Sequence, residues 1–285
     1  MAPNNRVVTG QGESTQVELT LKPATKPRKP LKVSLRMSEG DGEASYSRNS
    51  WMQGGILRDI GAELVEAVSH LTSLPTDGSP VRVADFGCSS GANTLAWADL
   101  AAKSVQHNIR LRNSKAGVAS SDPEVQHFFS DLPSNDWNTL FKTLASEQWP
   151  YFAAAVAGSF HGRLFPNEYL HIAISIWSVQ YLSMIPDALL DESSPAYNRD
   201  RVWIDGGHPG AAQAYAAQAR EDLFSFFTHR AYELAPGGLL FLMCMCRADH
   251  ARPERQTCGE FINANVCGIL FEEAWQECID QVKVT

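Results

Sequence analysis

The sequence predicts an α/β fold in which a parallel sheet carries helices on both faces. Short apolar segments with the length of buried strands alternate with longer segments of helical periodicity, and no internal repeat is visible. The first of these strands runs into a glycine-rich turn that leads directly into a helix. With 285 residues, the chain is long enough to bury a substantial core around such a sheet.

The composition argues against several classes of protein. Its 44% hydrophobic and 20% charged residues are typical of globular proteins. A net charge of −8 argues against a nucleic-acid partner bound through its phosphates. No run of 18 apolar residues and no signal-peptide core is present, so neither a membrane span nor secretion is expected. Five of the six cysteines follow position 243 without paired short spacings, which predicts free thiols and a cytoplasmic location.

We expect a disordered N-terminal tail over residues 1–34, followed by one domain over 35–285. The tail lacks hydrophobic periodicity and contains the basic, proline-bearing run KPATKPRKPLK at 22–32. Proline fixes φ and removes a backbone donor, so this run is a poor helix or strand.

The remaining elements follow from periodicity and turn signals. From Trp51 to Leu74 apolar residues recur every three or four positions, and Pro75 closes the predicted helix. Strands are expected at 81–86 and around 125–130, 151–156, 171–177 and 239–246. Helices are expected from near 93, near 136–146 and over 211–234, the last ended by Pro236-Gly237-Gly238.

The turn after the first strand, within VRVADFGCSSGANT at 81–94, has two readings. Gly87, Ser89 and Gly91 satisfy G-x-S-x-G, the nucleophile elbow of hydrolases. However, His229 lies inside a helical run, and no upstream segment resembles an oxyanion-hole loop. Asp85 would also place a negative charge near a developing oxyanion. We therefore decide against the hydrolase.

The other reading is a cradle for a nucleoside-like cofactor. Gly87 and Gly91 permit close backbone approach, and the helix start offers free N–H groups. Asp131, at the end of the next strand, is suited to accept two ribose hydroxyls. The fingerprint G-x-G-x-x-G is absent because Ser89 stands where its second glycine would be, which favours a nucleoside without phosphates, S-adenosylmethionine. A tight βα turn without a ligand would use similar residues.

Several longer motifs resemble those of one family, the SABATH methyltransferases, which are plant-type carboxyl and N-methyltransferases. The resemblance runs from about residue 37 to the end in the family's order. It is carried by MSEGDGEASYSRNSWMQ at 37–53, VADFGCSSGANTL at 83–95, FFSDLPSNDWNTLF at 128–141, VAGSFHGRLFP at 156–166, LHIAISIWSVQYLSMIP at 170–186 and QAREDLFSFFTHRAYELAPGGLLFL at 218–242.

The resemblance implies a Rossmann-like class I methyltransferase sheet with a partial helical substrate cap around 187–215 and 250–285. It also implies a set of cofactor-binding positions for S-adenosyl-L-methionine, with Asp85 supporting the turn from beneath. These positions are Tyr46, Asp85, Gly87, Cys88, Asn93, Asp131, Leu132, Ser159 and Phe160.

The acceptor implied by the resemblance is the carboxylate of a small-molecule acid, converted to a methyl ester. Gln53 matches the family glutamine that hydrogen-bonds this carboxylate. Trp177 stands where family members commonly have tyrosine, Gln180 where they have histidine or methionine, and Tyr181 where they have tryptophan. These departures favour an acid other than salicylate, although Trp177 and Tyr181 could instead simply pack against the sheet.

No catalytic acid or base is expected. A carboxylic acid with a pKa near 4 is already ionised at neutral pH, so the site needs only to position the reactants. His161, where the family usually has tyrosine, is interpreted as part of the loop structure.

The resemblance implies that the chain is shorter than family members at its C-terminus. We expect the strand at 239–246 to be an apolar edge, which leaves open a homodimer, a truncated isoform or a non-catalytic relative. The cysteines there are predicted to be buried thiols rather than zinc ligands. Asn198 is a weak metal candidate, and no metal is expected. An N-methyltransferase acting on a purine-like acceptor remains the alternative activity.

Overall fold

The computed structural model describes residues 38, 40, 42–43, 45, 49–117, 122–198, 201, 204, 209–246 and 273–280. The chain divides into two units, Met1–Pro30 and Leu31–Thr285, and every described residue belongs to the second. The predicted tail over 1–34 therefore lies outside the described residues, as does most of the predicted cap segment 250–285. Residues 273–280 form a helix.

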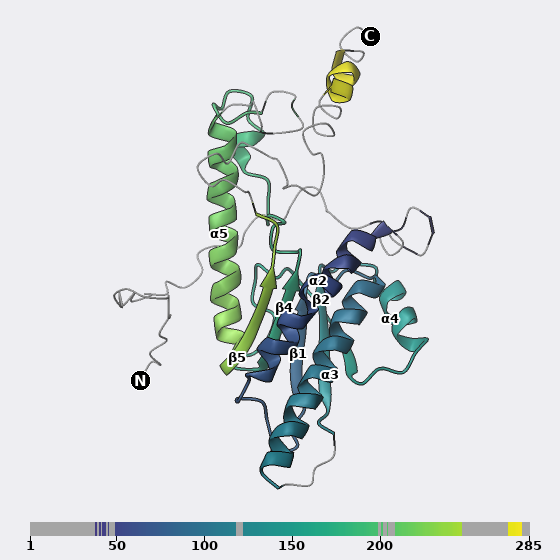
Figure 1. Ribbon diagram of the computed structural model, residues 1–285. Coiled ribbons are helices and arrows are strands. Elements are labelled where there is room, and N and C mark those ends of the chain that lie inside the picture. The colour runs from purple at the N-terminus through teal and green to yellow at the C-terminus, as the bar shows by residue number, and fades with distance from the viewer. Residues whose placement is uncertain are drawn as a thin grey trace, which may run out of the picture. The chain divides into compact units, whose positions relative to one another are not determined.

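Five parallel strands form one sheet in the order β3-β2-β1-β4-β5 (Figure 1). Each neighbouring pair is parallel, as the alternation of strands and helices predicts. The strands are β1 (Val81–Phe86), β2 (Val125–Asp131), β3 (Phe152–Ala157), β4 (Leu170–Ile176) and β5 (Leu234–Met243).

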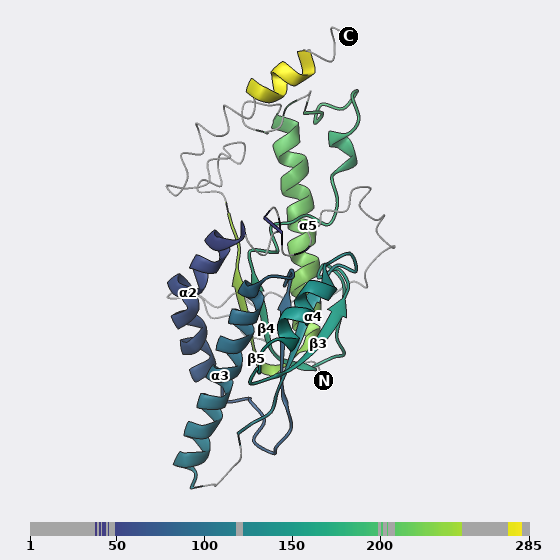
Figure 2. The ribbon, with the colours of Figure 1, turned by 90° about the vertical axis from the view of Figure 1, so that its right-hand side faces the viewer.

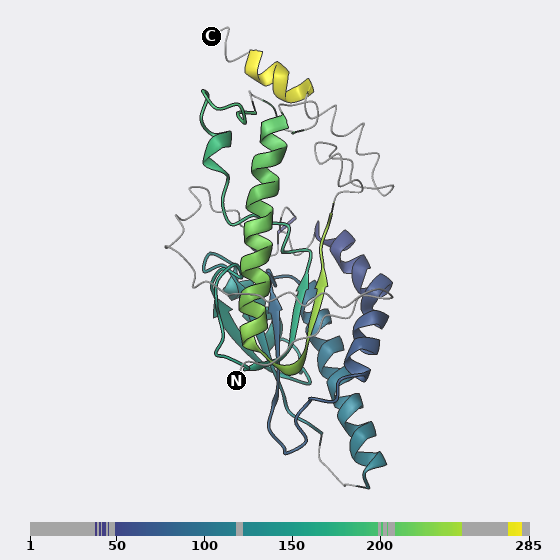
Figure 3. The same ribbon diagram turned by 90° about the vertical axis from the view of Figure 1, so that its left-hand side faces the viewer.

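Helices cover both faces of the sheet (Figures 2 and 3). The helices α2 (Trp51–Ser69), α3 (Ala92–Lys115) and α4 (Trp137–Ala145) share one apolar cluster with Val81 and Val83 of β1. The long helix α5 (Pro209–Glu233) contributes Phe226 to a second cluster with Ala84 and Phe86. Because side chains alternate along a strand, β1 is buried on both sides. A short 3₁₀ helix, η1, spans Asp187–Leu189.

The helix α2 ends at Ser69, five residues before the predicted end at Leu74. Asn108 of α3 explains the early stop. Its side-chain Nδ2 donates to the carbonyl oxygens of Val68 (2.8 Å), Ser69 (3.0 Å) and Leu71 (3.4 Å). A side chain from the neighbouring helix thus satisfies carbonyl groups that a further helical turn would otherwise occupy.

The boundary between α5 and β5 also differs from the prediction. We expected Pro236-Gly237-Gly238 to separate them, but β5 begins at Leu234 and contains these residues. Leu234 pairs with Leu170, and the register shifts before Leu239 pairs with Ile172. Proline is tolerated there because, in the described part of the chain, β5 is an edge strand bonded only to β4.

The prediction that the C-terminal cysteines are buried is wrong for those the structure describes. β5 ends at Met243, so Cys244 and Cys246 follow the sheet rather than alternate within it, and both are exposed. Cys278 is exposed as well. No helix within the described ranges is long and apolar enough to cross a membrane.

Candidate functional site

The loops that follow β1, β2, β3 and β4 meet at the carboxyl edge of the sheet, where open α/β sheets bind ligands. Asp131 joins two of them. Its Oδ2 accepts a hydrogen bond from the backbone N–H of Ser89 (2.7 Å), and its Oδ1 accepts one from the N–H of Leu132 (2.7 Å). The structure therefore brings together the two acidic loops that the sequence predicts to be neighbours.

The glycine turn is held closely by the loop after β4. Gly87 has φ +82°, and a Cβ there would overlap the side chain of Ser178 and lie 3.6 Å from the ring of Phe160. The hydroxyl of Ser178 donates to the Gly87 carbonyl (3.1 Å). Both the positive φ and this close approach require glycine.

Ser89 adopts φ +57°, which is uncommon outside glycine. Its N–H bond to Asp131 and a bond from Asn135 Nδ2 to its carbonyl (2.9 Å) hold it in this conformation. Its Oγ is buried and has no hydrogen-bond partner among the described residues. Strain and an unsatisfied hydroxyl at a strand end are features of ligand sites rather than of passive turns.

The electrostatics of the two acids differ. Burial raises the pKa of Asp131, while the N–H donors of Ser89 and Leu132 oppose the rise. Burial raises the pKa of Asp85 to about 7, although a hydrogen bond from the Thr94 hydroxyl (2.6 Å) acts to lower it. This hydrogen bond ties Asp85 of β1 to the first turn of α3.

A carboxylate has about four lone-pair sites, and the backbone N–H groups of Ser89 and Leu132 use two of those on Asp131. The remaining sites can accept hydrogen bonds from the adjacent hydroxyls of a ribose. The acceptor groups of this edge therefore fit the nucleoside part of S-adenosylmethionine.

The other predicted residues of the turn face α2. Cys88 is buried, and its thiol lies 3.3 Å from the Ser89 carbonyl oxygen. Asn93 Nδ2 donates to the carbonyl of Ser50 just before α2 (3.0 Å). A Cβ at Gly54 would lie 2.9 Å from Asn93 Oδ1, so α2 reaches the turn closely at this point. Gln53, half-buried, neighbours that contact on α2. Tyr46 lies outside the described residues.

The loop after β3 contacts the loop after β4. Ser159 is exposed, and its Oγ accepts the N–H of His161 (3.3 Å). Phe160 packs edge-on against Phe226 with 6.0 Å between ring centroids. His161 Nε2 lies 3.1 Å from the Tyr181 carbonyl oxygen, which gives this histidine a structural contact.

The loop after β4 presents the predicted acceptor-binding residues. Trp177 adopts φ +53°, and its N–H donates to the Met243 carbonyl (2.8 Å). Gln180 Nε2 donates to the Trp177 carbonyl (2.8 Å), whereas Gln180 Oε1 is buried without a partner in the described part of the chain. Tyr181 is 46% exposed, so simple packing against the sheet does not explain it.

Sequence reasoning missed two acids on α5, Asp222 and Glu233. Both are buried, and both bind backbone N–H groups of the loops described above. The available signal was their spacing, because charges four residues from the apolar Phe226 and eleven residues from Asp222 fall on one face of the helix.

Asn198, the candidate metal ligand, is hydrogen-bonded to Arg201. Its Nδ2 donates to the carbonyl of Arg201 (3.2 Å), and the N–H of Arg201 donates back to the Asn198 carbonyl (3.1 Å). Among the residues described, no group of three or more His, Cys, Asp or Glu side chains is arranged to hold a metal ion.

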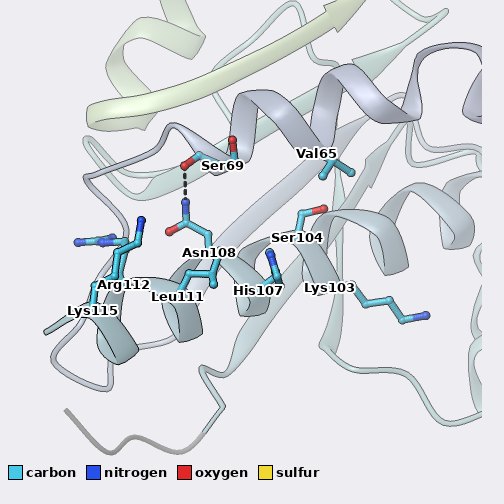
Figure 4. Close-up of a pocket in the computed structure, with 9 residues that line it drawn as sticks. All are labelled: Val65, Ser69, Lys103, Ser104, His107, Asn108, Leu111, Arg112 and Lys115. Carbon is cyan, nitrogen blue, oxygen red and sulfur yellow. Dashed lines mark hydrogen bonds between the residues drawn. The ribbon is translucent and has the colours of Figure 1, made fainter. Parts of the chain in front are cut away.

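A cavity of about 400 Å³ lies elsewhere, between α2 and α3 (Figure 4). It is lined by Val65, Ser69, Lys103, Ser104, His107, Asn108, Leu111, Arg112 and Lys115. Asn108 is 16 residues beyond the start of α3 at Ala92, or roughly 24 Å along the helix. The cavity is therefore remote from the glycine turn and separate from the four-loop site.

Comparisons with known proteins identify the family of the chain. The family described as "SAM dependent carboxyl methyltransferase" matches residues 32–284. Gibberellic acid methyltransferase 2 of Arabidopsis thaliana is 33% identical over 255 residues, which cover 86% of this chain and 63% of that protein. A 3,7-dimethylxanthine N-methyltransferase of Camellia sinensis var. assamica is 32% identical, covering 81% and 63%.

Among solved structures, loganic acid methyltransferase with SAH superposes with a TM-score of 0.75 at 30% identity, covering 86% of this chain and 67% of that one. The chain spans 63% of the length of gibberellic acid methyltransferase 2. Since the family match extends over residues 32–284, the protein belongs to the SAM-dependent carboxyl methyltransferases.

Proposed function

We propose that the protein transfers a methyl group from S-adenosyl-L-methionine to the carboxylate of a small-molecule acid, giving a methyl ester. This proposal rests on the hydrogen bonding of Asp131. Its carboxylate ties the loops after β1 and β2 together, and it has lone pairs left to accept the two hydroxyls of a ribose. The relatives support the reaction class, because two that match most of this chain are named as methyltransferases of gibberellic acid and loganic acid.

The bound cofactor would supply an electrophilic methyl group on a sulfonium. Asp131 would accept the ribose hydroxyls, and the Leu132 and Phe160 side chains would flank the adenine. Asp85 would keep the glycine turn in register from beneath, through its bond to Thr94. The full proposed set is Tyr46, Asp85, Gly87, Cys88, Asn93, Asp131, Leu132, Ser159 and Phe160.

The acid would lie against Gln53, Trp177, Gln180 and Tyr181. Its carboxylate is already a nucleophile at neutral pH, so these residues need only align its oxygen with the methyl carbon and exclude water. Such alignment can lower a barrier by roughly 7–11 kcal/mol. The contact of His161 with the Tyr181 carbonyl suits a reaction without a general base. The altered aromatic positions favour an acid other than salicylate.

Calorimetric titration with S-adenosylhomocysteine tests the cofactor assignment first. We expect micromolar binding at one site per chain, and at least a tenfold weaker affinity for Asp131→Asn, whose amide cannot accept on both atoms. Asp122→Asn, at an exposed carboxylate, is the matched control and should bind like the wild type. Absence of binding by the folded wild-type chain would contradict the proposal.

The acceptor is then identified by incubating the protein with radiolabelled S-adenosylmethionine and a panel of carboxylic acids. A base-labile product is the expected methyl ester. A base-stable product would instead indicate N-methylation, the activity named for the dimethylxanthine relative. Cofactor binding without any transfer would indicate a non-catalytic relative.

We also propose a cytoplasmic protein whose methyltransferase domain spans 35–285. Homodimer formation through β5 is proposed because its outer edge has no strand partner within the described ranges. Sedimentation of the purified chain at several concentrations measures this directly.

A further inference from the structure

The helix α5 carries buried charged side chains that bind the loops of the proposed site as well as one another. Arg230 is 1% exposed and Glu233 is fully buried, and their side chains form an ion pair of 2.8 Å. Burying an ion pair is costly and seldom adds stability by itself. The additional hydrogen bonds of this pair therefore indicate what it does.

Arg230 and Glu233 hold the backbone of the loop after β3. Arg230 donates to the carbonyl oxygens of Phe160 (3.2 Å) and Gly162 (3.0 Å). Glu233 Oε1 accepts the N–H groups of Leu164 (2.6 Å) and Phe165 (3.0 Å). The guanidinium also lies over the ring of Phe86, 4.0 Å from its centroid, at the end of β1. The carbonyl of Phe160, a proposed cofactor contact, is thus fixed by α5.

Asp222 holds the loop after β4 in a similar way. It is 1% exposed, and it accepts the N–H of Ser183 (2.8 Å) on Oδ2 and the Ser183 hydroxyl (2.6 Å) on Oδ1. Gln218 Nε2 adds a third donor at 3.0 Å. These bonds hold its pKa below the usual range, although burial acts to raise it. Ser183 lies two residues after Tyr181, a proposed contact of the acid.

The two anchors share one face of the helix. Asp222, Phe226, Arg230 and Glu233 follow at intervals of four, four and three residues, so their side chains line up. Asp222 and Arg230 are about 12 Å apart along the axis, at 1.5 Å per residue. Between them, Ser225 Oγ donates to the His161 carbonyl (2.7 Å).

We infer that Asp222, Arg230 and Glu233 are positioning residues for methyl transfer, and that α5 sets the separation between the cofactor loop and the acceptor loop. This inference rests on the proposed function. The Arg230–Glu233 pair governs the cofactor side, and Asp222 governs the acid side.

Paired variants separate the two anchors. In Arg230→Met/Glu233→Met both charges are removed together, which leaves no unpaired buried charge and allows the chain to fold. We expect its dissociation constant for S-adenosylhomocysteine to rise 10- to 100-fold, while the KM of the acid at saturating cofactor changes less than threefold.

Ser183→Ala should raise the KM of the acid about tenfold, with cofactor affinity within threefold of wild type. Arg220→Met, which removes an exposed charge of the same helix, should change neither quantity.

Hydrogen exchange supplies a readout independent of turnover. The amides of Leu164 and Phe165 should exchange faster in the double variant, and that of Ser183 should exchange faster in Asp222→Asn. The inference fails if the double variant and Ser183→Ala each change cofactor affinity and acid KM by equal factors. It also fails if neither loop exchanges faster in the variant that removes its anchor. If the wild type binds no S-adenosylhomocysteine, the proposed function fails by that result alone, and unaltered exchange would separately overturn the anchoring. Arg230→Lys, which keeps the charge but loses the two-pronged donor, should give an intermediate affinity.

Discussion

At the scale of single residues, the most informative group is an amide oxygen. Gln180 Nε2 is committed to the Trp177 carbonyl, so Oε1 is fixed as an acceptor, and it is buried without a donor in the described structure. An unsatisfied buried acceptor costs about 1–3 kcal/mol. Under the proposed function, an acid that brings a hydroxyl or N–H to this oxygen would remove that cost.

Gln180→Leu therefore should change selectivity more than activity. We expect kcat/KM for an acid bearing a hydroxyl or N–H donor to fall about tenfold, and kcat/KM for the same acid without the donor to stay within threefold. The paired substrates act as each other's control, measured in the ester-forming assay. Equal losses for both would show that Gln180 does not distinguish donors.

At the scale of elements, the glycine turn and the loop after β4 depend on one another. Gly87→Ala meets two obstacles, its positive φ and the side chain of Ser178. We expect it to lower the free energy of unfolding by about 3 kcal/mol, of which about 1–2 kcal/mol is the left-handed backbone. In a Ser178→Gly background the overlap disappears, and only the backbone part should remain.

Urea unfolding of the four proteins in this cycle gives the interaction energy directly. Equal costs of Gly87→Ala in both backgrounds would mean that Ser178 does not confine the turn. Gly78→Ala is a matched control, because its φ is +86° and no atom lies within 4 Å of its Cβ position.

The elements show how far sequence reasoning reaches. The parallel sheet and the approximate positions of its strands could be predicted, because hydrophobic runs and helical periodicity are local properties. The end of α2 could not, since Asn108, 39 residues after Ser69, decides it through space. The start of β5 at Leu234 also depends on pairing with Leu170, which no local signal in Pro236-Gly237-Gly238 contains.

The site was predictable to a similar extent. Asp131 and the glycine turn could be placed together because both follow neighbouring strands. The role of Arg230 and Glu233 could not, because a buried ion pair on a helix has no signature apart from the loop that it binds. Exposure of Cys244 and Cys246 was missed for a related reason, since the strand ends at Met243.

At the scale of the whole molecule, buried titratable groups set the dependence of stability on pH. His127 packs against the rings of Phe129 and Tyr151, and both of its ring nitrogens are unpartnered in the described structure; burial lowers its pKa to about 3. Burial, with the nearby charge of Arg82, lowers the pKa of His171 to about 4. Asp85 is shifted the other way, to about 7.

The signs follow from which state binds more protons. Below pH 6.5 the unfolded chain protonates both histidines while the folded chain does not, so each histidine lowers stability as the pH falls toward 4. Asp85 keeps its proton in the folded chain between about pH 4 and 7, so its contribution falls as the pH rises. Urea unfolding should show how the free energy of unfolding changes as the pH falls from 6 to 4.5. His127→Phe should lose about 1.4 kcal/mol less per pH unit than the wild type, and Asp85→Asn should lose more than the wild type by a comparable amount. Identical slopes for all three proteins would contradict these assignments.

The spacing of the anchors on α5 restricts how this protein can diverge. A single residue inserted between Asp222 and Arg230 would turn one anchor by about 100° relative to the other, so one of the two loops would lose its partner. Insertions before Gln218 leave both anchors in phase. Changes of length before Gln218 therefore preserve the spacing of the anchors, whereas the segment from Asp222 to Glu233 must keep both its number of residues and its three anchoring side chains.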